Sequence, residues 1–137
     1  MESLVQTATK FAPQLLILLF LVITFLQSGI DKLTDWKGNL SFLKDHFGKT
    51  FLKNSVPFML GIVMIGELIV GVLGIISIVQ IYVYGIMTIG FYTAVLAGKV
   101  LLALLLGQRI VKDYAGSMTI AVYFMVTVFG VYLLAQY

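Results

Sequence analysis

The chain of 137 residues contains no cysteine and only one histidine, His46. The absence of cysteine excludes thiol–disulfide chemistry, iron–sulfur clusters and thiolate metal sites. One histidine cannot by itself supply a bis-histidine haem or a multi-histidine metal centre. We therefore expect no metal site and no intrinsic redox centre, so that any redox role would need a bound organic cofactor or a partner subunit.

Charged residues are also scarce, at 11% of the chain, whereas a soluble domain has about 25%. Hydrophobic residues make up 61% and the mean hydropathy is +1.07, which indicates a protein that lies in lipid. The formal net charge of +3 is too small to suggest binding of nucleic acid. Because one membrane span needs about 20 residues, four spans nearly exhaust the length and leave no room for a soluble domain.

We expect an all-α polytopic membrane protein, an antiparallel bundle of four transmembrane helices forming a single domain over residues 1–137. The apolar stretch Val56–Gly107 is roughly twice one bilayer crossing and must fold back once, which we expect at Ser77–Tyr82, around Gln80. The apolar run Leu15–Leu26 has no small-residue cleavage site after it, so we expect the first helix to be retained. The expected spans cover about residues 11–30, 57–78, 82–106 and 117–135.

An amphipathic segment separates the first two expected spans. Leu40, Leu43, Phe47 and Phe51 fall at helical spacing, while lysines punctuate the other side. The segment is too short and too charged to span, which is typical of a helix lying on the membrane surface. We therefore predict an interfacial helix over Leu40–Leu52.

The positions of Lys and Arg predict the orientation. The two loops on one side, residues 31–55 and 107–116, hold seven of these residues, whereas Lys10 alone lies on the other side. Positively charged loops face the cytoplasm in most membrane proteins. We therefore expect both termini on the extracytoplasmic side.

Glu67 and Lys99 are the two charged residues between Val56 and Gly107. Isolated charge is costly at bilayer depth, which makes a carboxylate there a functional-site hypothesis. A rise of 1.5 Å per residue puts the two at depths that differ by about 5 Å, within reach of a lysine stem. We predict a shared interior polar site of Glu67 and Lys99, with Tyr92 along its wall, Asp31 near its mouth and Gln27 on the polar face of the first helix.

Two plainer interpretations stay open for these charges. Glu67 can be a packed structural acid that fixes helix register. Lys99 can be a lysine whose stem lies in lipid while its ammonium reaches the interface.

Three local patterns resemble the DoxX-like family of small bacterial four-helix membrane proteins. They are Ser28-Gly29-Ile30-Asp31-Lys32-Leu33, Glu67-Leu68-Ile69-Val70-Gly71-Val72-Leu73-Gly74, and Gly107-Gln108-Arg109-Ile110-Val111-Lys112-Asp113-Tyr114-Ala115-Gly116. The last pattern is similar to family members from Bacteroidota. The resemblance covers nearly the whole chain.

This resemblance implies a helical bundle in the bacterial inner membrane, with Asp31, Lys32, Glu67 and Asp113 at recurring polar positions. Lys32, Arg109 and Asp113 form the polar motif of its loops. Members of the family have been linked to quinone-coupled sulfur oxidation, to membrane oxidoreductase assemblies and to stress responses. A shared fold transfers function poorly, however.

Three functions therefore remain as hypotheses. The leading one is a subunit or scaffold of a larger membrane complex, respiratory or quinone-linked, which contacts lipids and other membrane proteins or a second copy of itself. The second is a binding or transport module that holds a quinone, a lipid or another small amphiphile around Glu67. The third, an enzyme that uses Glu67 as acid or base, has no assured second catalytic group.

Overall fold

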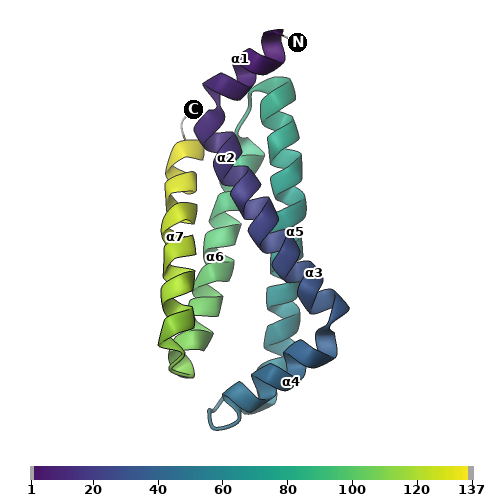
Figure 1. The fold of residues 1–137 in the computed structure, drawn as a ribbon, viewed down its shortest axis with the longest axis vertical. Helices are drawn as coiled ribbons and strands as arrows, with labels where there is room; N and C mark the ends of the chain where they lie inside the picture. Colours follow the sequence, from purple (N-terminus) through teal and green to yellow (C-terminus); the bar gives the residue numbers. More distant parts are fainter. Residues whose placement is uncertain (1, 136–137) are drawn as a thin grey trace.

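The computed structural model describes residues 2–135, which form helices joined by short turns (Figure 1). The helix α2 (Ala12–Leu21) continues without a break into η1 (Val22–Leu26), a short stretch of π-helix, and then into α3 (Gln27–Thr34). In chain order the elements are α1 (Glu2–Lys10), α2 (Ala12–Leu21), η1 (Val22–Leu26), α3 (Gln27–Thr34), α4 (Trp36–Phe47), the 3-10 turn η2 (Lys53–Ser55), α5 (Val56–Tyr84), α6 (Thr88–Ile110) and α7 (Tyr114–Leu134).

Within residues 2–135, four helical segments are long and apolar enough to cross a membrane. They are Ala12–Thr34, Lys53–Tyr84, Thr88–Ile110 and Tyr114–Leu134. The expected number of helices long and apolar enough to span is thus confirmed, and each segment reaches the roughly 20 residues that one crossing needs. Pro13 lies in the first turn of α2, where its missing N–H leaves no hydrogen bond unmade.

The turn between the second and third spans lies at residues 85–87, so the prediction of a turn at Ser77–Tyr82 was wrong. Gly85 ends α5 with a positive φ of 66°, a conformation that glycine adopts at little cost, and its N–H donates to the Ile81 carbonyl. Gln80 remains helical, and its Oε1 accepts a hydrogen bond of 3.2 Å from the Ile89 N–H at the start of α6. Its polar side chain therefore caps the next helix.

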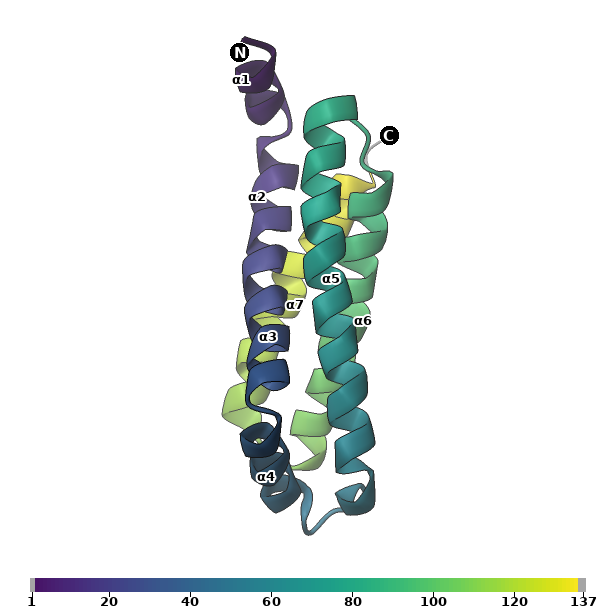
Figure 2. The same ribbon diagram turned by 90° about the vertical axis from the view of Figure 1, so that its right-hand side faces the viewer.

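A helix also forms between the first two spans, but α4 covers Trp36–Phe47 and not Leu40–Leu52. Asp35 caps its start, since Oδ1 accepts from the Gly38 N–H. The chain leaves the helix at Gly48, so Phe51 lies outside it. Figures 1 and 2 show α4 across one end of the long helices, with α1 and the end of α7 at the other.

Small residues set the spacing of the long helices. A Cβ on Gly71 of α5 would lie 2.9 Å from the Leu26 Cβ, and one on Gly74 would lie 2.6 Å from a Val22 methyl group. The first span and α5 therefore approach closely, as membrane helices with small interface residues do. On α6 the buried face is Gly90, Thr93, Ala94, Ala97, Val100 and Leu101.

A short polar contact lies inside this apolar packing. The Ser77 and Thr93 hydroxyls are 3.1 Å apart, and each also lies within hydrogen-bond distance of a carbonyl of its own helix. Because a hydroxyl carries one hydrogen, one of the two donates to the other, which donates to its own carbonyl. Both residues are fully buried. The hydroxyls join α5 to α6 without leaving a polar group facing lipid.

We expect Gly71→Ala to lower the free energy of unfolding by about 1–3 kcal/mol, because the added methyl group meets the Leu26 backbone region and overpacks the contact. Gly98→Ala is the matched control, since its Cβ would lie 3.8 Å from the nearest side-chain atom, in ordinary contact. Unfolding of the purified protein in mixed micelles measures both. Equal effects of the two substitutions would contradict the close approach at Gly71.

Candidate functional site

Glu67 forms an ion pair with Lys32, a residue of α3. The Lys32 Nζ lies 2.8 Å from the Glu67 Oε1, and the two side chains are 15% and 4% exposed. The same Nζ donates a hydrogen bond of 2.8 Å to the Ser28 hydroxyl, one turn earlier on α3. The ammonium therefore has two partners, and the buried carboxylate is not an isolated charge.

A glycine allows this pair to form. Gly29 lies between Ser28 and Lys32 on α3, and a Cβ at its position would lie 2.8 Å from the Leu68 side chain and 3.2 Å from the Leu68 backbone nitrogen. Leu68 is the neighbour of Glu67 on α5. Because the two backbones come close at this point, the lysine stem can reach the carboxylate.

Lys99 does not contact Glu67, so the predicted pair of these two residues is wrong. Lys99 is exposed on α6 and forms no ion pair within residues 2–135. Tyr92, on the same face, is 64% exposed and does not line a site with Glu67. The face of α6 that packs inward contains small residues such as Gly90, Ala94 and Ala97, because close helix contact outweighed burial of the polar stripe.

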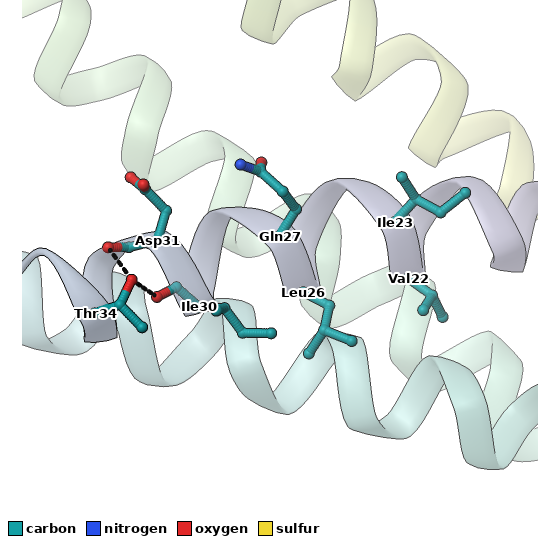
Figure 3. Close-up of a pocket in the computed structure, with 7 residues that line it drawn as sticks. All are labelled: Val22, Ile23, Leu26, Gln27, Ile30, Asp31 and Thr34. Atoms are coloured by element: carbon teal, nitrogen blue, oxygen red, sulfur yellow. Dashed lines mark hydrogen bonds between the residues drawn. The ribbon is translucent and has the colours of Figure 1, made fainter.

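Asp31 and Gln27 are also exposed and lie apart from the ion pair. Together with Thr34 they line an open groove along the first span (Figure 3). The side chains of Gln27 and Asp31 point to one side of the helix, whereas Leu26 points toward α5. Asp31 Oδ2 accepts a hydrogen bond of 3.5 Å from the Asn39 side chain. The single interior site predicted from the sequence is therefore not formed.

The three residues of the predicted loop motif, Lys32, Arg109 and Asp113, do not form one site. Asp113 caps α7, since Oδ1 accepts a hydrogen bond of 3.0 Å from the Gly116 N–H. Lys32 and Asp113 line the same cavity, whereas the Arg109 guanidinium lies over the Tyr114 ring, 4.8 Å from its centroid. Arg109 is exposed and does not line this cavity.

This cavity has a volume of about 280 Å³ and lies between α4, the first turns of α5 and the last turns of α6. Its walls include Phe47, Leu60 and Leu104, and its polar lining includes Lys32 and Gln108. Sequence reasoning missed Gln108 as a site residue and missed Lys32 as the partner of Glu67. The spacing of Ser28 and Lys32, one turn apart on the same face of the helix, was a signal for the role of Lys32.

Across the part of the chain that the structure describes, no group of three or more His, Asp or Glu side chains is arranged to hold a metal ion. Comparisons of the chain with models of protein families, with characterised proteins and with solved structures found no match.

We expect Lys32→Met and Glu67→Leu each to lower the free energy of unfolding by about 3–5 kcal/mol, because each leaves one buried charge without its partner. The double substitution should recover most of the loss, since a buried pair replaced by apolar side chains is often tolerated. A double-mutant cycle in mixed micelles measures the coupling.

The control cycle pairs Glu67→Leu with Lys99→Met. These two changes should be additive, because Lys99 lies on the outer face of α6. Strong coupling of Glu67 to Lys99 and none to Lys32 would show that the pairing described above is wrong.

Proposed function

We propose that this protein is a subunit or scaffold of a larger complex in a bacterial inner membrane, with a DoxX-like architecture. The observation that carries the proposal is the position of Lys99. It is the central residue of α6, a helix of 23 residues, and its side chain is exposed. An ammonium at this position needs a partner outside the chain.

The direction and depth of Lys99 support this argument. It follows the buried Ala97 by two residues, which turns it by about 200° to the opposite face of the helix. About 16 Å of helix separates it from either end of α6, which is far more than a lysine stem can cover. A lysine at the centre of a spanning helix costs about 2.5–3.5 kcal/mol on insertion scales, so a paired position is favoured.

The charge inventory of the chain indicates which partner fits. The natural counterion of Lys99 is a carboxylate at the same depth, and a second copy of this chain has none to offer. Glu67 is already paired with Lys32, and the other acids lie outside the middle of the spans: Glu2, Asp31, Asp35, Asp45 and Asp113. We therefore propose a different membrane protein, with an Asp or Glu in a spanning helix.

The proposal includes the arrangement in the bilayer. Val22 meets Gly74, Leu26 meets Gly71 and Gly29 meets Leu68, so residue numbers rise on one helix as they fall on the other. This order supports an antiparallel bundle. On α4 the apolar Phe47 is buried against the bundle, whereas the lysines of the helix are exposed. This arrangement supports a position of α4 at the cytoplasmic interface.

A photo-crosslinking amino acid at Leu102, one turn from Lys99 on the exposed face of α6, should capture the partner in native membranes. The matched control is Met125, which is equally apolar, exposed and near the middle of α7. Lys99→Met should abolish the Leu102 adduct and Lys99→Arg should retain it, because only the charge is needed. Mass spectrometry of the adduct identifies the partner and its acidic residue.

Two outcomes would contradict the proposal. Adducts to lipid alone would indicate that Lys99 draws its counterion from head groups through a thinned bilayer. An adduct between two copies of this chain would exclude a partner of a different kind.

The orientation can be tested with single cysteines, because the natural chain has none. We expect a membrane-impermeant maleimide, added to intact spheroplasts, to label Thr9→Cys and not Lys49→Cys, since the loop with most of the lysines should face the cytoplasm. Both positions are exposed, and a permeant maleimide should label both. Labelling of Lys49→Cys alone would invert the orientation.

A further inference from the structure

The cavity beneath α4 has few polar groups that are free to bind anything. Lys32 is held by Glu67 and Ser28, and the Asp113 carboxylate is held by the Gly116 N–H. Asn39 donates to the Asp35 carbonyl. The charges of the cavity are thus occupied within the protein itself, and the remaining lining is mostly apolar.

Gln108 is the buried exception, whereas the His46 ring, which also lines the cavity and stacks on Phe42, is exposed. Gln108 lines this cavity, and its side-chain Oε1 is buried and accepts no hydrogen bond from residues 2–135. A buried acceptor without a partner costs about 1–3 kcal/mol, so a donor placed in the cavity would recover that free energy. A hydroxyl group suits this amide in either orientation of its O and N atoms, because a hydroxyl both donates and accepts.

The surroundings also select against a charged ligand. An anion would compete with Glu67 for Lys32 and leave a buried carboxylate unpaired, whereas a cation would meet an ammonium already in place. The apolar walls, among them Phe47, Val63 and Leu104, favour a ring or a short apolar group. The charges of the lining and its apolar walls therefore both favour a neutral ligand.

We propose that this cavity binds the neutral, hydroxyl-bearing head group of an amphiphile, with Gln108 as the hydrogen-bonding residue. Its volume of about 280 Å³ is just below the roughly 300–1,000 Å³ of most ligand pockets, so one ring fits and a whole lipid does not. The tail of the amphiphile lies outside the cavity, along the exposed apolar surface near Phe42. This inference goes beyond the proposed function, and Gln108 lies about 180° around α6 from Lys99.

Trp36 provides a direct readout, because it is the only tryptophan in the chain and lies on α4 three residues before Asn39, which lines the cavity. A Cβ on Gly61 would be 3.8 Å from the Trp36 ring, and the adjacent Leu60 lines the cavity. The probe is a brominated octylphenol added to the full-length protein in lipid nanodiscs. Bromine quenches tryptophan at short range, so binding should give saturable quenching of Trp36.

Gln108→Leu should weaken binding of the phenol about five- to tenfold, the effect of losing one hydrogen bond. Gln14→Leu is the matched control, since Gln14 also has a buried Oε1 without a partner among the described residues but bonds Leu133 at the other end of the bundle. It should leave the affinity unchanged. The methyl ether of the probe should bind the natural protein as weakly as the phenol binds Gln108→Leu.

Several results would overturn the inference. Equal affinities for the phenol and its methyl ether would show that the ligand forms no hydrogen bond through its hydroxyl group. This comparison uses the natural protein, so it holds even if the Gln108→Leu protein fails to fold. Linear quenching that Ala103→Phe, which fills the cavity, does not reduce would indicate partition into lipid alone. Tighter binding of a brominated octylbenzoate than of the phenol would exclude a neutral ligand.

Discussion

The close approach of the first span to α5 is the constraint on which the polar interior depends. Glycines at 29, 71 and 74 leave no room for a methyl group without displacing a neighbour, so the two helices meet almost backbone to backbone. At this distance Lys32 reaches Glu67 from α3. The ion pair then neutralises the one carboxylate that the chain carries deep in a span, which a bilayer would otherwise penalise. Packing of small residues and pairing of charge are thus two parts of one helix contact.

Much of the fold follows from composition and length, because lipid restricts a spanning segment to a helix of about 20 residues. The number of spans could therefore be predicted from apolar stretches alone. The turn after α5 could not be placed from polarity, since Gln80 looks like a loop residue but serves as a cap for α6. Gly85, five residues later, was the better signal, because a helix end with positive φ favours glycine. Hydropathy favours Gln80 over Gly85 as the turn and therefore points to the wrong position.

The candidate site was harder to predict, for a reason that lies in helix rotation. Depth arithmetic compares positions along the helix axes and says nothing about the direction in which a side chain points. Thr88, Tyr92 and Lys99 form a polar stripe, and the rule that polar groups turn inward placed that stripe in the bundle. The structure turns α6 the other way, because Gly90, Ala94 and Ala97 allow the tighter contact. In membrane proteins small residues and polar residues both favour helix–helix interfaces, and in α6 the small residues occupy the interface.

The two membrane charges of this chain consequently differ in what they require. Glu67 is satisfied within the fold, and its partner is fixed by a backbone contact that no ligand needs to complete. Lys99 is satisfied by nothing in residues 2–135, although it occupies the centre of its helix. A protein that could simply avoid this cost would carry an apolar residue there, as the neighbouring Val100 and Leu101 do. In the proposed complex the partner's carboxylate would pair with Lys99, and the apolar residues around Lys99 would exclude lipid from that contact.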